Sequence, residues 1–325
     1  MTRTLARRTL EFGITFFLAI SINFLLPRLV PGDPLALIAG NAAPQLGRAR
    51  VDALRAQYGL DKPLGEQYVI YLGNLAHGDL GQSYRYSGGK SVVEVLSENF
   101  RWTLLLVGVS LSLSFLIGSA LGVWSATKRG TVSDLSLLSS IYLLRSVPPF
   151  WLAMLLIPVF AIQLGWLPSG DSYSIPRLEG WTNIKDIALH ALMPVTVLTL
   201  AYLPTAFVIM RAAMFGIMEA DYIRTARAKG VPAPGVILKH ALRNALLPIL
   251  TAFMLDFGQL LGGVTVIEAV FNYRGLGNMM FEAVKSRDYP LLQGGFLLFT
   301  IIILLLNILT ELFYPLLDRR VQRPT

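Results

Sequence analysis

The segment from Trp102 to Thr127 contains no charged residue and is apolar over most of its length. A helix needs about 20 predominantly apolar residues to cross the hydrocarbon core of a bilayer, and this segment is long enough. Its apolar residues form one long run, whereas those of a soluble domain recur with a helical or alternating period. Charged residues are only 15% of the chain, against about 25% in soluble domains. Both features predict membrane spans.

Five other segments qualify as spans or nearly do, so the chain is predicted to be an all-α polytopic membrane protein with six transmembrane helices. The first resembles a signal peptide because basic residues precede an apolar stretch. A small-residue cleavage site does not follow it, and we expect the helix to be retained. The predicted segments are 1–26 with the first helix, 27–101 as a long extracytoplasmic segment, and 102–325 as the membrane core with spans 102–127, 135–164, 187–210, 246–271 and 291–317.

Basic residues predict the orientation of these spans. Cytoplasmic loops carry an excess of Lys and Arg, whereas long loops translocate largely regardless of charge. Basic residues precede the first span, follow the second, crowd segment 212–247 and end the chain, so both termini are expected inside. The net charge of +8 therefore fits a membrane protein and does not require nucleic acid. Within the outer segment, residues 44–60 are predicted to form an amphipathic helix ending at Gly59.

The inner segment 212–247 is predicted to hold two short helices with a kink. Good helix formers run from Met218 to Lys229, and Gly230 suits the position just past a helix end. Pro232 stops continuation, and Pro234 fits the first turn of a second helix. Charge is concentrated here, and the composition alone is equally that of a solvated, positive-inside loop.

The first of these helices also contains small side chains, which allow close approach by another surface. They are Ala220, Thr225, Ala226 and Ala228. Arg224 and Arg227, three residues apart, are neighbours on the helix surface. A small-residue face beside a charged one is suited to docking into a groove on a soluble partner.

The stretch "EADYIRTARAKGVPAPGVILKHALRNALLPIL" resembles the loop of permease subunits of ABC importers, in the dipeptide/oligopeptide/nickel branch. The Glu-Ala pair, the Gly and the Leu-Pro of that loop correspond to Glu219-Ala220, Gly230 and Leu247-Pro248, while Asp221 stands where many families have a second Ala. The resemblance to this branch covers nearly the whole chain and includes the stretches "PGDPLALIAG", "PPFWLAMLL", "LGWLPSG" and "LLGGVTVIEAVF".

The resemblance implies a type I ABC importer permease fold in a bacterial or archaeal cytoplasmic membrane. It implies a second homologous permease subunit, two cytoplasmic ATPases and an extracytoplasmic binding protein as partners. ATP and Mg would be bound by the ATPases, so no cofactor, catalytic residue or metal site is expected in this chain. The loop helix would couple ATPase closure to movement of the permeases. By carry-over the coupling residues are Glu219, Ala220, Asp221, Arg224, Thr225, Ala226, Arg227 and Gly230.

The resemblance leaves the substrate open. Relatives with these motifs import dipeptides, oligopeptides, nickel chelates, glutathione or oligosaccharides. Peptide is the substrate we expect, and oligosaccharide is the second choice. A membrane-embedded enzyme is the alternative of a different class. The "GGKS" stretch lacks the first Gly of a phosphate-binding loop, and the three His residues have no metal-ligand spacing.

Two charges interrupt predicted spans, Arg145 in the third and Asp256 in the fifth. At 1.5 Å per residue, Arg145 lies about 16 Å along from Asp134, and Asp256 about 12 Å from Pro248. Because both stretches start at the cytoplasmic side, the two charges are expected at similar depth. Intramembrane charges usually face a partner or a watery cavity. We therefore expect an ion pair, or two cavity-lining groups that meet a zwitterionic substrate.

Overall fold

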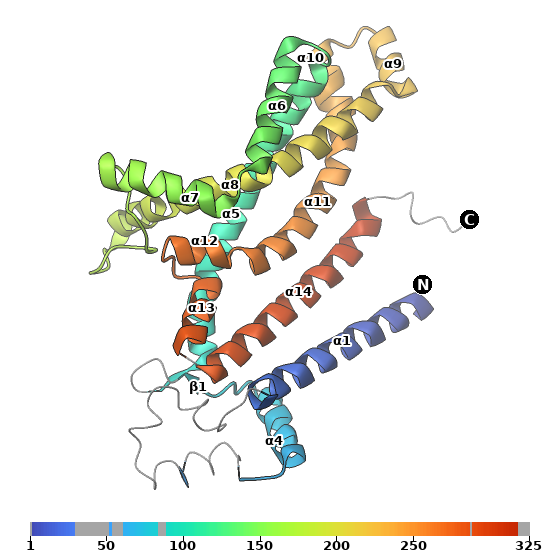
Figure 1. Ribbon diagram of the computed structural model, residues 1–325. Coiled ribbons are helices and arrows are strands. Elements are labelled where there is room, and N and C mark those ends of the chain that lie inside the picture. The colour runs from blue at the N-terminus through green and yellow to red at the C-terminus, as the bar shows by residue number, and fades with distance from the viewer. Residues whose placement is uncertain (1, 30–51, 54–60, 84–88, 287, 318–325) are drawn as a thin grey trace. The chain divides into compact units, whose positions relative to one another are not determined.

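The computed structural model describes residues 2–29, 52–53, 61–83, 89–286 and 288–317, and these are mostly helical (Figure 1). Most of the amphipathic helix expected at 44–60 lies outside the described residues. Four described helical runs are long and apolar enough to cross a membrane, and a strongly bent pair of helices makes a fifth. The four are Val92–Thr127, Gly180–Met218, Ala233–Leu260 and Tyr289–Leu309. The chain is therefore a multi-pass membrane protein.

The first expected span falls in α1, which runs from Thr2 to Leu29. The apolar stretch of α1, Leu10–Leu25, is shorter than those of the four long runs. This helix resembles a span in composition, and a count of six stays a prediction.

The chain divides into two compact units, and the first combines residues 1–103 with 274–305. Its elements are α1, α4 (Leu64–Ala76), β1 (Gln82–Ser83), β2 (Lys90–Ser91), the start of α5 (Val92–Thr127), α13 (Leu276–Ser286) and most of α14 (Tyr289–Leu317). In the antiparallel hairpin Gln82 pairs with Ser91 and Ser83 with Lys90. Beyond it, Val92, Val95 and Leu96 of α5 form a buried core with residues of α13 and α14.

Polar contacts join distant parts of this first unit. The side-chain amide of Asn23 donates to the carbonyl oxygen of Gln293 at 2.8 Å, and the Gln293 amide donates back to that of Asn23 at 2.9 Å. This reciprocal pair connects α1 to the start of α14 within the first unit. Lys90 contacts the carboxylates of Glu98 at 2.7 Å and Glu94 at 3.4 Å, and the hydrogen bond to Glu98 raises the pKa of Lys90.

The second unit contains residues 104–273 and 306–325. Its described elements are the rest of α5, α6 (Val132–Ser146), α7 (Pro149–Leu156), η2 (Ile157–Gln163), α8 (Gly180–Met218), α9 (Asp221–Ala228), α10 (Ala233–Gly235), η3 (Val236–Ala241), α11 (Leu242–Gly263) and α12 (Thr265–Val270), with the end of α14. The long helix α8 packs against α6, α7 and α11. It is the most extensively buried of the candidate spans.

Helices α5 and α8 approach closely at two glycines spaced four residues apart. A Cβ atom on Gly118 would lie 2.7 Å from the backbone oxygen of Leu203, and one on Gly122 would lie 2.9 Å from that of Phe207. Such small-residue spacing lets membrane helices bring their backbones together. Above this contact the Ser114 hydroxyl donates to the backbone oxygen of Thr199 at 2.8 Å. The α5–α8 pair is therefore held by backbone proximity and by interhelical hydrogen bonds.

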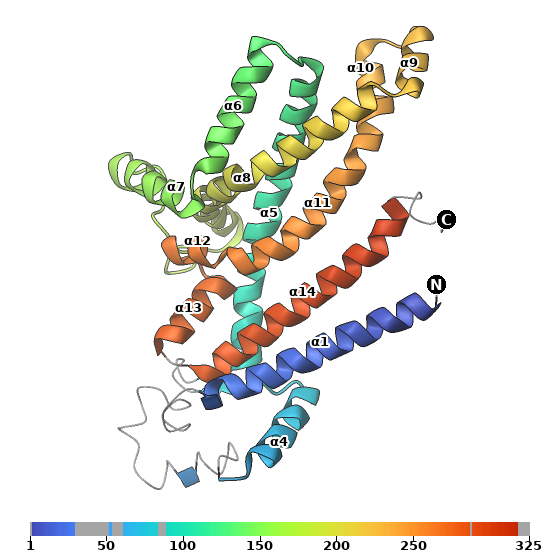
Figure 2. The same ribbon diagram turned by 45° about the vertical axis from the view of Figure 1, so that its right-hand side comes forward.

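The third expected span, 135–164, is not one straight helix. Helix α6 ends at Ser146, α7 begins at Pro149, and the axes of the two segments differ by 91° (Figure 2). Val147 has an extended backbone, as the residue before a proline prefers. Pro148 and Pro149 lack the amide hydrogens that would continue the helix. The bend therefore follows from the Pro-Pro pair.

The fifth expected span, 246–271, also differs in its bounds. The helical run begins at Ala233, and α11 ends at Gly263. A separate short helix, α12, covers Thr265–Val270 and contains the fully buried Glu268. The helical run includes charged residues before position 246. A span drawn from hydropathy alone leaves this polar start out.

Candidate coupling site at the 212–247 loop

A sharp turn separates α8 from the short charged helix α9. Helix α8 ends at Met218, and Glu219 follows it as the C-cap. Ala220 then has an extended backbone (φ −70°, ψ 147°), and its carbonyl oxygen accepts from the amides of Ile223 at 3.0 Å and Arg224 at 3.2 Å. An extended residue whose carbonyl takes the first intrahelical bonds is the N-cap of a helix. Glu219-Ala220 thus defines where the chain changes direction.

The other end of α9 is closed by a Schellman motif around Gly230. The amide of Gly230 donates to the carbonyl of Arg227 at 3.0 Å, and the amide of Val231 donates to that of Ala226 at 3.2 Å. This pair of bonds requires a residue with positive φ, and Gly230 has φ of 77°. Pro232 is the N-cap of α10 and starts the next helical run. The expected helix, glycine stop and second helix are all present.

Helix α9 has a buried side and an exposed side. Ile223 and Ala226, three residues apart, are 0% and 6% exposed, and α9 packs against η3. The Tyr222 hydroxyl accepts from the Asn244 side chain at 2.9 Å, which connects α9 to α11. The remaining side chains of α9 are exposed: Asp221, Arg224, Thr225, Arg227 and Ala228.

The position of Ala226 differs from the expected small-residue docking face. Ala226 lies on the same side as Ile223, toward the chain's own helices, because residues three apart share a helix face. A partner surface could reach Thr225 and Ala228, which are exposed, but not the Ala226 methyl group in this conformation. The exposed face is instead dominated by charge, with Arg224 3.6 Å from Asp221.

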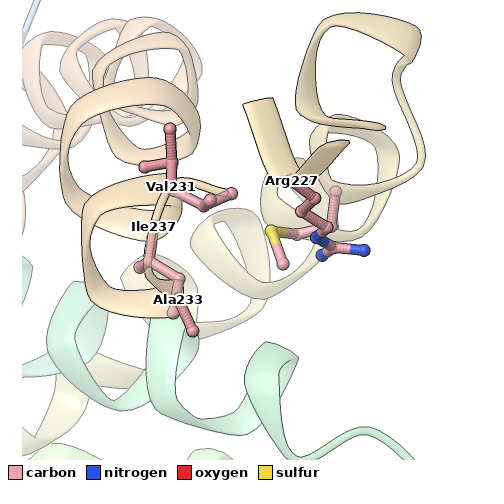
Figure 3. Close-up of a pocket in the computed structure, with 6 residues that line it drawn as sticks. Arg227, Val231, Ala233 and Ile237 are labelled. Carbon is pink, nitrogen blue, oxygen red and sulfur yellow. The ribbon is translucent and has the colours of Figure 1, made fainter. Parts of the chain in front are cut away.

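A small open cavity lies beside α9. Its volume is about 190 Å³, and Figure 3 shows Arg227 on one side with Val231, Ala233 and Ile237 opposite. Met218 and Val236 complete the lining. Five of the six lining side chains are apolar, and the sixth carries a positive charge. The cavity thus combines an apolar lining with one positive charge.

Arg145 and Asp256 are not brought together. Arg145 is exposed near the end of α6, and no ion pair or hydrogen bond joins the two side chains, both of which are described. One carboxylate oxygen of Asp256, Oδ2, is buried without a hydrogen-bond partner among the described residues. The ion pair is therefore absent from this conformation, and the cavity-lining role stays a prediction.

The buried His190 makes a local hydrogen bond within its own helix and is not part of a metal-ligand cluster among the described residues. His190 Nδ1 lies 2.9 Å from the backbone oxygen of Asp186, whose carboxylate accepts from the Ser174 hydroxyl at 2.6 Å. Among described residues, three or more His, Cys, Asp or Glu side chains do not gather in a way that could hold a metal ion. The expectation about metals for the whole chain stays a prediction.

The chain belongs to the family of inner membrane components of binding-protein-dependent transport systems. The family description "Binding-protein-dependent transport system inner membrane component" matches residues 118–323, and its N-terminal companion matches residues 1–106. Together they cover both units, and the loop around α9 lies inside the first match. The chain is thus an ABC transporter permease subunit, a class of proteins that are not themselves enzymes.

Several relatives that are similar over nearly their full length are named as permeases of transport systems. A Brucella ovis protein with a provisional peptide-permease name is 38% identical over 96% of this chain and 97% of its own. A di/tripeptide transport system permease of Pseudomonas aeruginosa is 35% identical over 99% of both chains. A glutathione transport system permease of Escherichia coli K12 is 35% identical over 98% of both.

Solved structures share the fold. An inward-facing structure of the MetNI methionine ABC transporter has a TM-score of 0.56, is 19% identical, and covers 70% of this chain and 97% of its own. An amino acid ABC transporter crystallised with histidines has a TM-score of 0.51 at 18% identity, covering 68% and 94%. The likeness supports an importer permease fold for most of the chain.

Proposed function

We propose that this chain forms half of the translocation pathway of an ATP-driven peptide importer, and that α9 is the element on which a cytoplasmic ATPase acts. The observation that carries the proposal is the geometry of α9. It is short, stopped at both ends by an extended N-cap and a glycine motif, fixed between two candidate spans, and charged on its exposed side. A helix held at both ends transmits a push to the spans that flank it.

The proposal includes the orientation and the partners expected from the sequence. With six spans and both termini inside, α9 faces the cytoplasm, where it meets an ATPase that binds ATP and Mg. A second homologous permease completes the pathway, and two ATPases act on the pair. An extracytoplasmic binding protein delivers the substrate from the other side. The chain itself binds no cofactor in this scheme.

Peptide is the proposed substrate class because of the relatives' names. The Pseudomonas aeruginosa relative is named for di- and tripeptides and the Escherichia coli relative for glutathione, at the same identity. Both substrates are short peptides with free charged ends, so glutathione is the second candidate within one chemical class. The test is uptake of labelled dipeptide and of glutathione into vesicles holding the assembled transporter, each delivered by the cognate binding protein.

Contact between α9 and the ATPase is tested by photo-crosslinking from two neighbouring alanines. A benzophenone side chain at Ala228, which is exposed, is expected to capture the ATPase in intact cells. The same group at Ala226 serves as the matched control, since its Cβ faces the chain's own helices and is 6% exposed. Equal capture from both positions, or none from Ala228, would contradict the proposed coupling face.

Arg145 and Asp256 are proposed to line the substrate path and to meet the two ends of a peptide. A buried carboxylate oxygen without a partner is costly unless a cation reaches it, and a peptide ammonium group would satisfy Asp256 Oδ2. The variants Asp256→Asn and Arg145→Gln are each expected to lower peptide uptake about tenfold, as the loss of one charge-assisted contact of ~1.4 kcal/mol would. Uptake is measured in vesicles, with Gln259→Asn on the exposed side of α11 as the control. Normal uptake by both charge variants would refute this role.

A further inference from the structure

Three side chains on one face of α8 reach the turn between α5 and α6. Arg211, Phe215 and Glu219 are spaced four residues apart, so they form a stripe along the last two turns of α8. Glu219 directly precedes the N-cap of α9, and Arg211 lies about 12 Å further back along the axis at 1.5 Å per residue. The stripe therefore extends from the residue before the N-cap of α9 back along the last two turns of α8.

The inner end of the stripe is an ion pair between the buried Asp134 and the partly buried Arg211, whose side chain is 19% exposed. Arg211 donates to Asp134 through Nη2 at 2.9 Å and through Nε at 3.2 Å, and its Nε is also 2.8 Å from the Ser125 hydroxyl. Asp134 is 1% exposed and further accepts from the Ser125 hydroxyl and from the Gly130 amide at 3.1 Å. Removal of the Arg211 charge would leave the Asp134 carboxylate buried without a counter-charge. This contact joins the end of α5, the start of α6 and α8.

The outer end of the stripe is held by contacts to the half-buried Phe215 ring and by one exposed ion pair. Two guanidinium groups contact the Phe215 ring, that of Arg211 at 4.4 Å and that of Arg129 at 4.7 Å from its centroid. Arg129 then contacts Glu219 at 3.0 Å, with side chains 62% and 70% exposed. Exposed ion pairs contribute little, whereas the buried pair two turns away is strongly constrained. Contact strength thus decreases along α8 toward α9.

We propose that Arg211 is the positioning residue through which displacement of α9 reaches α5 and α6. The Arg211–Asp134 pair makes the α5–α6 turn move with α8, while the weak Arg129–Glu219 contact lets α9 tilt without breaking that connection. The inference rests on the proposed function, in which an ATPase acts on α9. In this scheme, residues 128–134 between α5 and α6 also take part in coupling, although they lie outside the 212–247 loop.

The test compares transport with ATP hydrolysis in the assembled importer. Arg211→Lys keeps the charge but loses the two-point geometry, and Asp134→Asn removes the partner charge. In vesicles holding both permeases, the ATPases and the binding protein, each variant is expected to lower the substrate transported per ATP about tenfold, within the range by which coupling residues act. ATP hydrolysis itself is expected to stay within about twofold. The double variant is expected to lose no more than either single one, since both act through one contact.

Two controls separate positioning from general stability. Ser136→Ala, on the exposed side of α6, removes a hydroxyl that bonds only within its helix (3.1 Å to the Ser133 carbonyl), and Arg177→Lys repeats the Arg-to-Lys change at an exposed site. Both controls are expected to keep the wild-type ratio. An unchanged ratio in Arg211→Lys and Asp134→Asn would overturn the inference, as would transport and hydrolysis falling in parallel with folded yield. If the wild-type permease captured no ATPase, the proposed function would fail instead, and the inference with it.

Discussion

Gly122→Leu is expected to leave very little folded permease in the membrane. Gly122 lies where α5 meets α8, and a Cβ there would stand 2.9 Å from both the Met210 Cβ and the Phe207 backbone oxygen. These obstacles are a backbone atom and a Cβ, which cannot rotate away, so α5 and α8 would have to separate. Overpacking costs ~1–3 kcal/mol and more when backbones move, a large part of the ~5–15 kcal/mol that stabilises a typical domain.

A matched control for this substitution lies on the same helix. Gly108 is also in α5, and a Cβ there would meet nothing within 4 Å, so Gly108→Leu is expected to fold normally. Gly122→Ala adds only the Cβ and should lie between wild type and Gly122→Leu. Folded yield from size-exclusion chromatography in detergent and the thermal unfolding midpoint check the series. Equal yields from Gly108→Leu and Gly122→Leu would show that close helix packing is not what Gly122 provides.

The presence of the main spans could be predicted from the sequence, but not their path. Long apolar runs identify α5, α8 and α14, because hydropathy shows whether an apolar segment is long enough to cross the hydrocarbon core of a bilayer. It does not record backbone direction. The Pro148–Pro149 pair favours a break through its own backbone chemistry, but the 91° angle also depends on what packs around it. By contrast, the apolar run that contains α11 and α12 has no proline pair at the point where the two helices separate.

The ends of α9 could be predicted because they obey local rules, whereas its buried side was misjudged. Gly230 and Pro232 act through their own backbone chemistry, so the sequence suffices for them. A set of small residues does not tell which side of a helix is covered. Ile223 is the one bulky aliphatic residue of α9, and it marks the buried face that Ala226 shares at a spacing of three.

The stripe on α8 could be predicted from the sequence only in part. Arg211, Phe215 and Glu219 repeat at helical spacing, which predicts a shared face. Their partners could not be assigned, because Asp134 is 77 residues from Arg211 in the chain. Only the fold brings the α5–α6 turn to that face. Short-range order was thus accessible from the sequence, and the long-range pairing that connects the coupling loop to the spans was not.

Reversing the charge of both exposed arginines on α9 is expected to abolish ATP-driven uptake. In Arg224→Glu/Arg227→Glu, acidic groups of the proposed ATPase partner would meet carboxylates in place of guanidinium groups. Close interfacial charge pairs are worth ~1.5 kcal/mol or more each, so two reversals amount to a loss of about 100-fold or greater in affinity. Both side chains are exposed in the isolated chain, so the folded state should tolerate the change.

The measurements are co-purification of the ATPase with the permease and peptide uptake in the same preparation. Arg177→Glu/Lys185→Glu is the matched control, since it makes the same change in net charge at two exposed positions away from α9 and should retain the ATPase. Any weakening of capture in the control would act only through distant charges and should disappear at higher ionic strength, because salt screens distant charges. Should the α9 reversal keep both the ATPase and uptake, the charged face of α9 would not be the contact, and the apolar cavity beside Arg227 would be the next surface to test.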